Sequence, residues 1–164
     1  MVNRKSEIYI KNGLALGGYD VVQIFESREV KPGLPSFQYK YEGAVWTFSS
    51  EDNLRLFRAN PSKYKPAYGG YCAYGISQGY KAPTRIHLFE VVDNVLYFNF
   101  SPYIKRFWIR HQTFLIDMAD DKWLNIQHDP MIRVNYYWIY LKYLVFKSLG
   151  IPFFGKVESP QITG

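Results

Sequence analysis

The stretch from residue 37 to residue 50 reads FQYKYEGAVWTFSS and gives the clearest indication of the fold class. Aromatic residues at 37, 39 and 41 alternate with polar ones, Glu42-Gly43 supplies a turn, and residues 45–48 return as a second apolar run. This pattern predicts an antiparallel β-hairpin. Ser49 and Ser50 follow as candidate N-caps, so we expect a helix over residues 51–59.

A second hairpin is predicted further along the chain. Residues 88–92 and 95–100 are apolar runs on either side of an Asp93-Asn94 turn. Ser101-Pro102 then predicts the start of a helix, and residues 112–123 are also typical of one. We therefore expect an α+β fold, in which a small antiparallel sheet from two hairpins is packed by helices, plus a C-terminal helix.

The N-terminal region adds a strand and a glycine-rich turn. Residues 7–10 are predicted to form a short strand, and residues 13–20 a turn that lacks the G-x-G-x-x-G spacing of a dinucleotide loop. A short apolar segment, 21–25, follows. Asp20 is either a general base or a capping residue, and capping is favoured because Asp readily hydrogen-bonds the backbone two residues on.

The C-terminal stretch predicts a helical extension, 129–164, beyond a domain over residues 1–128. Residues 131–149 are rich in apolar and aromatic residues and would make a helix about 30 Å long, close to the thickness of a bilayer core. Lys142 in its middle argues against a membrane span. Three alternatives stay open for this helix: packing on its own domain, pairing in a homo-oligomer, or contact with a membrane interface.

Composition limits the function classes. The chain has 164 residues, 48% of them hydrophobic and 19% aromatic, which excludes a disordered chain and predicts an aromatic core. The net charge is +6, but Lys and Arg are scattered, whereas a nucleic-acid partner would require them on one face. The single cysteine excludes an internal disulfide and a multi-cysteine metal site. No signal peptide is visible, so we expect a cytoplasmic protein, with an exported form whose signal was removed as the alternative.

Several motifs, taken together, resemble the YHS domain in its stand-alone form. The most specific is the string from Tyr68 to Ala73, YGGYCA. The others run in order along residues 13–124: GYDVV at 18–22, the hairpin with its FSS ending at 48–50, NP at 60–61 before Tyr64, the VDNVLYFN hairpin at 92–99, and AD at 119–120 before Trp123.

The resemblance implies little about activity, since many stand-alone members have none assigned. Related short domains attached to heavy-metal transporters look like metal-binding modules, and there the junction of hairpin and helix reads F-C-S-x-x-C. In this chain the two thiol positions are Ser49 and Asn53. Soft metals select thiolates, so the substitutions argue against a transporter-type metal role.

The motif residues suggest a ligand site in the Gly/Tyr-rich loop. The candidate ligand-binding residues are Tyr19, Asp20, Tyr68, Gly69, Gly70, Tyr71, Cys72, Tyr97 and Asn99. Gly69 and Gly70 could alternatively open a backbone nest for an anion. If a metal ion is the cofactor, the candidate ligands are Cys72, His87 and His111, although no two of the three histidines share a helical i, i+4 spacing.

The sequence thus predicts a non-catalytic binding module for a small ligand, a metal ion or a protein partner. The first alternative is a thiol-dependent or redox enzyme that uses Cys72, which would require a cation or histidine near the sulfur. A purely structural role is the other interpretation of Cys72, as a small apolar residue buried in the core. The second alternative is a structural, oligomer-forming or membrane-surface protein acting through residues 131–149.

Overall fold

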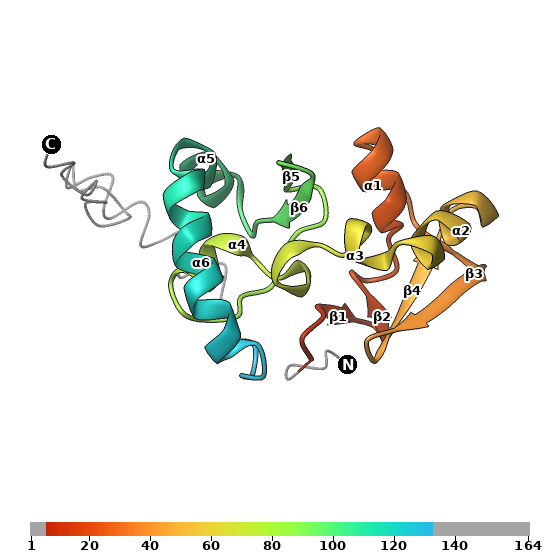
Figure 1. Ribbon diagram of the computed structural model, residues 1–164, viewed down its shortest axis with the longest axis horizontal. Coiled ribbons are helices and arrows are strands. Elements are labelled where there is room, and N and C mark those ends of the chain that lie inside the picture. Colours follow the sequence, from red (N-terminus) through yellow and green to blue (C-terminus); the bar gives the residue numbers. More distant parts are fainter. Residues whose placement is uncertain (1–5, 133–164) are drawn as a thin grey trace, which may run out of the picture. The chain divides into compact units, whose positions relative to one another are not determined.

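The structure is a computed structural model that describes residues 6–132 (Figure 1). The described residues lie in the first of two units into which the chain divides. The elements of the first unit, in chain order, are β1 (Ile10–Lys11), β2 (Leu14–Ala15), α1 (Val21–Ser27), β3 (Leu34–Tyr41), β4 (Ala44–Phe48), α2 (Glu51–Ala59), α3 (Pro61–Tyr64), the 3-10 helix η1 (Ala67–Gly70), α4 (Ala73–Ser77), β5 (Phe89–Val92), β6 (Val95–Phe98), α5 (Pro102–Arg110) and α6 (Gln112–Ile126).

The α+β class and both predicted hairpins are confirmed. In β3–β4, Tyr39 lies opposite Trp46, and the Glu42-Gly43 turn has the positive φ angles, 47° and 71°, that a tight hairpin requires. In β5–β6, Phe89 lies opposite Phe98 across the Asp93-Asn94 turn. The hairpins do not share one sheet, however, because each forms a separate two-stranded sheet, as does β1–β2.

The N-terminal region differs from the prediction in where its strands lie. The strand expected over residues 7–10 begins only at Ile10, because the Tyr9 N–H donates to the Gly69 carbonyl instead of to a strand. The glycine-rich turn contains β2, which pairs with β1 around Asn12-Gly13. The apolar segment at 21–25 belongs to α1, which Asp20 caps.

Most of the helical predictions are confirmed. Helix α2 begins after Ser50, whose side chain accepts a hydrogen bond from the Asn53 N–H at 3.1 Å. Helices α5 and α6 also lie where they were expected, separated at His111. The short elements α3, η1 and α4 were not predicted. The predicted helix over 131–149 and the extension over 129–164 lie almost wholly outside the described residues, so both stay predictions.

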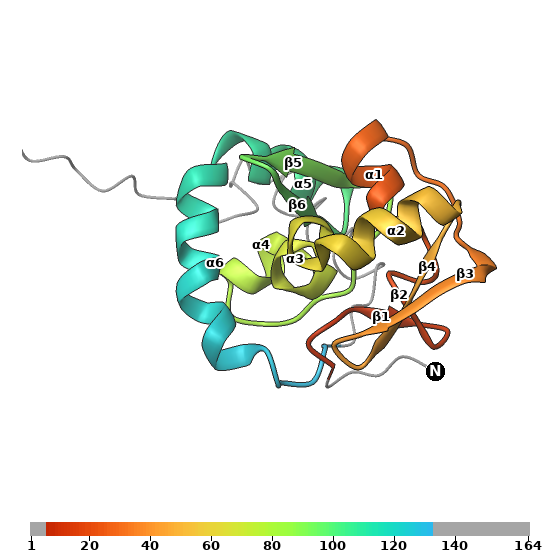
Figure 2. The same cartoon turned by 45° about the vertical axis from the view of Figure 1, so that its right-hand side comes forward.

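Two groups of aromatic rings form much of the core. Around β3–β4, the Phe57 ring contacts Trp46 and Phe48, each with centroids 5.1 Å apart. Around β5–β6, the Tyr97 ring lies 5.2 Å from Trp108 and 5.9 Å from Tyr68. Figures 1 and 2 show the β3–β4 hairpin beside α1 and α2, and the β5–β6 hairpin near α5.

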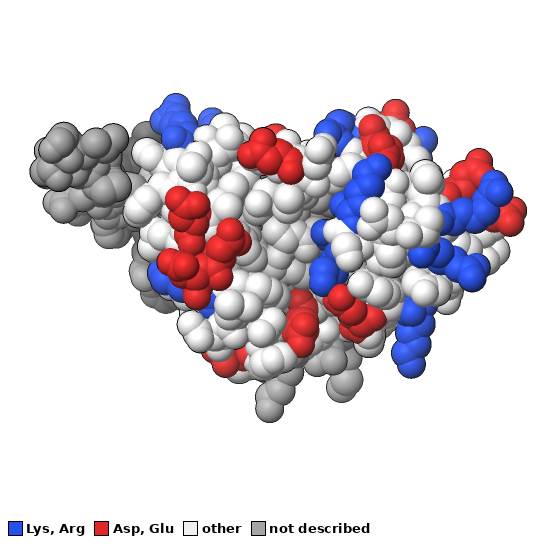
Figure 3. Space-filling view, in the orientation of Figure 1, with Lys and Arg blue, Asp and Glu red and all other residues white. Residues whose placement is uncertain are grey.

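The described surface carries both signs of charge. On the face drawn in Figure 3, acidic side chains gather over α6 and basic side chains over α2, α3 and β3. Within residues 6–132, none of the helices is both long enough and apolar enough to cross a membrane.

Candidate ligand-binding site

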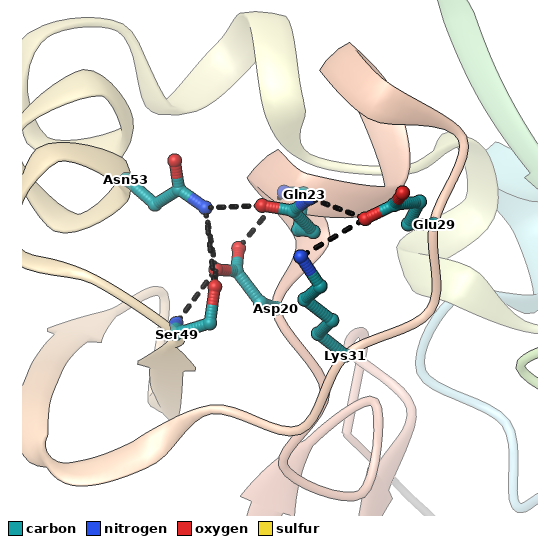
Figure 4. Close-up of polar contacts among 6 residues, drawn as sticks. All are labelled: Asp20, Gln23, Glu29, Lys31, Ser49 and Asn53. Carbon is teal, nitrogen blue, oxygen red and sulfur yellow. Dashed lines mark hydrogen bonds and ion pairs between the residues drawn. The ribbon is translucent and has the colours of Figure 1, made fainter.

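Asp20 is a buried carboxylate at the N-terminus of α1 (Figure 4). Its Oδ1 accepts hydrogen bonds from the backbone N–H groups of Val22 and Gln23 at 2.9 and 3.0 Å. Its Oδ2 accepts from the Ser49 backbone N–H, the Ser49 hydroxyl and the Asn53 amide, all at 2.7 Å. The prediction that Asp20 is a capping residue is confirmed, and the cap also ties α1 to the β4–α2 junction.

The same cluster lies at the junction of hairpin and helix, where the metal-binding relatives of the YHS domain have their two thiols. Its chemistry therefore decides whether this chain can hold a soft metal ion there. Ser49 and Asn53 occupy the two thiol positions, and both donate hydrogen bonds to Asp20. The cluster contains no thiolate, and the carboxylate oxygens are already used by five protein donors. Gln23 continues the cluster outward to Glu29, which pairs with Lys31 (Figure 4). These residues do not fit a soft metal ion.

The candidate metal ligands elsewhere have separate surroundings. The His87 ring lies against Tyr19, with centroids 6.4 Å apart, whereas the His111 ring lies 4.6 Å from Phe107. Cys72 is buried against Asn99. In the part of the chain that the structure describes, no three side chains among His, Cys, Asp and Glu come close enough together to hold a metal ion.

Cys72 is buried and linked to its neighbours mainly through its backbone. Its side chain is 1% exposed, and its Sγ lies 3.8 Å from the Asn99 Oδ1. Burial raises the pKa of the thiol to about 11, so the thiolate is scarce at neutral pH. The backbone of Cys72 pairs with Phe98, and its N–H donates to the Ala82 carbonyl. This environment does not support a nucleophilic or redox-active cysteine.

The Gly/Tyr-rich loop is also inside the fold. The Tyr68 hydroxyl lies 2.8 Å from Asp120, and the Tyr71 hydroxyl donates to the Ser6 carbonyl at 2.7 Å. A Cβ added at Gly69 would lie 1.7 Å from the Glu7 carbonyl oxygen, so this glycine allows the backbone of the N-terminal segment to approach closely. The loop, which includes most of η1, therefore contacts both the N-terminal segment and α6.

An open pocket lies elsewhere, between the β1–β2 hairpin and the segment 84–87. It is a pocket of about 350 Å³, within the size range typical of small-molecule sites. The residues that line it are Tyr9, Lys11, Asn12, Leu16, Gly17, Tyr19, Thr84, Arg85, Ile86 and His87. Of the nine predicted ligand-binding residues only Tyr19 lines this pocket, and His87, a predicted metal ligand, also lines it. The other eight are buried.

Asn99, one of the predicted ligand-binding residues, holds the pocket segment 84–87 through its backbone. Its carbonyl oxygen accepts hydrogen bonds from the Thr84 hydroxyl and the Arg85 N–H, both at 3.1 Å. Its N–H donates to the Leu88 carbonyl, and the Leu88 N–H closes a turn onto the Arg85 carbonyl. The segment 84–87 is thus held by strand-like backbone bonds although it is not a strand itself.

Residues 28–68 match the YHS domain family model. The YHS match confirms the resemblance over a shorter range than the expected 13–124, and the rest of the chain matches no family model. The matched range, 28–68, includes Ser49 and Asn53 but none of the residues that line the pocket. No curated protein and no solved structure matches the chain. The pocket residues Lys11 and Arg85 were missed because no sequence motif connects two segments about 70 residues apart.

Proposed function

We propose that this chain is a non-catalytic binding module for a small ligand, and that its site is the pocket between the β1–β2 hairpin and residues 84–87. One observation carries the proposal: the pocket has a volume of about 350 Å³ and is lined by polar and aromatic side chains, whereas the motif string at 68–73 is inside the fold. Sites with convergent polar groups on an apolar lining are typical of ligand binding.

The backbone around the pocket supports the same conclusion. The Leu16 N–H donates to the Tyr9 carbonyl at 2.8 Å and extends the pairing of the β1–β2 hairpin, and the Tyr9 N–H donates to the Gly69 carbonyl and ties the hairpin to its surroundings. The opposite wall is held by Asn99. Walls that are fixed before binding reduce the ordering cost of association.

The thiol-enzyme alternative has less support. A cysteine nucleophile requires a lowered pKa and access to substrate, and Cys72 has a raised pKa and is buried. The structural alternative depends on residues 131–149, which lie outside the described residues apart from Met131 and Ile132. Oligomer formation by that segment stays a prediction, to be checked by sedimentation of the full chain over a range of concentrations.

The proposal is tested by titrating the isotope-labelled full chain with three small aromatic probes: benzamide, benzoate and benzamidine. They share a ring and differ in the charge of the head group, so the test does not presuppose the charge of the natural ligand. We expect amide shifts from at least one probe to concentrate at residues 11–19 and 84–87. Shifts from none of the probes, or shifts centred on α5 and α6, would contradict the proposal.

A matched pair of tyrosine variants sharpens the test. Tyr19 lines the pocket, so Tyr19→Ala should weaken every probe that binds there, whatever its charge. Tyr103 lies on α5, is 39% exposed and is not part of the lining, so Tyr103→Ala should leave binding unchanged. Equal effects of the two substitutions would place the binding site elsewhere.

A further inference from the structure

The charges around the pocket are all of one sign. Its lining includes the cations Lys11 and Arg85, and no Asp or Glu is among the lining residues that the structure describes. We infer that the pocket takes a ligand with an anionic head group, a carboxylate or a phosphate, attached to a flat body. This inference rests on the proposed function and adds the chemical class of the ligand.

Lys11 supplies a positive charge that the described protein does not use. Four other lysines, Lys31, Lys63, Lys65 and Lys105, form ion pairs with glutamates. Within residues 6–132, no hydrogen bond or ion pair joins the Lys11 Nζ to another side chain or to the backbone. Its backbone pairs with Leu14 across the Asn12-Gly13 turn, so the start of the lysine side chain is fixed at the pocket edge.

Arg85 adds a second cation on the opposite wall. Its N–H donates to the Asn99 carbonyl and its own carbonyl accepts from Leu88, so its backbone is fixed on both sides. A guanidinium presents paired N–H donors that match the oxygens of a carboxylate or a phosphate. Two cations from separate segments, each with its backbone held by hydrogen bonds, thus line one pocket that an anionic group can enter.

The remaining lining suits a flat body next to the anion. The rings of Tyr19 and His87 meet at 71°, with centroids 6.4 Å apart. Tyr9, 7% exposed, adds a third ring, and its ring packs against Tyr71 behind it. Leu16 and Ile86 contribute apolar surface. Aromatic and apolar walls favour a ring-bearing ligand over a free inorganic ion.

The inference is tested by dissociation constants for the full chain in low salt, with benzoate, phenyl phosphate, benzamide, benzamidine and inorganic phosphate. We expect at least one of the two aromatic anions to bind about tenfold more tightly than benzamide, the gain typical of one charge-assisted hydrogen bond. Benzamidine should bind most weakly. A preference for phenyl phosphate would identify a phosphate ligand, and a preference for benzoate a carboxylate. If inorganic phosphate bound as tightly as phenyl phosphate, the inference that the ligand has a flat body would be contradicted.

Two lysine variants provide the matched control. Lys11→Gln should weaken the preferred anion roughly five- to tenfold while leaving benzamide unchanged. Lys40 is also an exposed strand lysine but does not line the pocket, so Lys40→Gln should change neither. Raising the salt concentration should weaken the anions and not benzamide.

The outcomes separate this inference from the proposed function. Equal binding of benzoate, benzamide and benzamidine in the pocket would overturn the anion inference and leave the ligand-binding function standing. Absence of any probe from the pocket would overturn both. Equal losses from Lys11→Gln and Lys40→Gln would show that only the net charge of the protein matters, which also overturns the inference.

Discussion

Asp20 is the residue that connects most local structure through one side chain. Its two carboxylate oxygens accept five hydrogen bonds from two separate parts of the chain. Asp20→Ala should lower the free energy of unfolding by about 3 kcal/mol, because it removes a helix cap and leaves buried donors unpaired. Urea titration measures the loss.

Ser50→Ala is the matched control for this prediction. Ser50 caps α2 through a single hydrogen bond to the Asn53 N–H, so its loss should cost about 1 kcal/mol. Similar losses for the two substitutions would mean that Asp20 is only a helix cap and that its bonds to Ser49 and Asn53 contribute nothing measurable.

Ser49 and Asn53 permit a direct test of the absent metal site. The Ser49 Oγ and the Asn53 Nδ2 lie 3.4 Å apart, close enough for two sulfur ligands on one metal ion. The double variant Ser49→Cys/Asn53→Cys should therefore bind Cu(I) in a competition titration, whereas the unmodified chain should not bind it at this cluster. Stoichiometric Cu(I) bound by the unmodified chain and lost in Asp20→Ala would contradict the account of this cluster.

For single residues, the sequence predicts local roles better than hydrogen-bond partners that are distant along the chain. The cap on α1 could be predicted, since an Asp before an apolar segment is a local signal. The bonds from Asp20 to Ser49 and Asn53 could not, because 29 and 33 residues separate them. Tyr71 and Gly69, in the motif string at 68–73, pack closely against residues 6–9, a contact that no local pattern predicts.

Among the elements, the contact between η1 and the N-terminal segment depends on one glycine. Gly69 has a φ of 61°, and a Cβ there would lie 1.7 Å from the Glu7 carbonyl oxygen. Gly43, in the β3–β4 turn, has a φ of 71° but nothing within 4 Å of its would-be Cβ. Both alanine substitutions carry the left-handed backbone strain, of about 1–2 kcal/mol.

The difference between the two glycine variants isolates the close approach. Gly69→Ala should cost at least about 2 kcal/mol more than Gly43→Ala, because backbone atoms must move to relieve the overlap. Thermal or urea unfolding of the two variants measures the difference. Equal costs would show that residues 6–9 are not held against η1 as the structure has them.

Elements with strong local signals could be predicted, and contacts between them could not. Glu42-Gly43 and Asp93-Asn94 identify both hairpins, and Ser50 identifies the start of α2. Helix α1 was not recognised because its seven residues give too short a period to distinguish a helix from a strand. The pocket was missed since it arises only where β1–β2 meets the turn that Asn99 holds.

For the whole molecule, the aromatic core predicts sensitivity to alkaline pH. Burial raises the pKa of seven described tyrosines: Tyr9, Tyr64, Tyr68, Tyr71, Tyr74, Tyr80 and Tyr97. In the unfolded chain these groups lose their protons near the ordinary tyrosine pKa, whereas the folded state keeps them. The free energy of unfolding should therefore fall as pH rises above about 10. A free energy unchanged up to pH 11 would contradict this.

Lys81 has the opposite effect in a lower pH range. The side chain is buried, and its Nζ donates to the carbonyls of Ser6 and Gln127 at 2.8 Å. Burial lowers its pKa to about 8. Between about pH 8 and the ordinary lysine pKa the unfolded chain binds the extra proton, so stability should rise with pH there. The same urea series on Lys81→Met should lack this rise and keep the fall above pH 10.

The most direct test of the central claim is a crystal structure of the full chain soaked with 4-iodobenzoate, in which anomalous scattering locates the iodine. The account predicts an iodine peak inside the pocket formed by residues 9–19 and 84–87, with the carboxylate directed toward Lys11 and Arg85. An iodine peak on another surface, or an empty pocket at a concentration that saturates the shifts in solution, would contradict it.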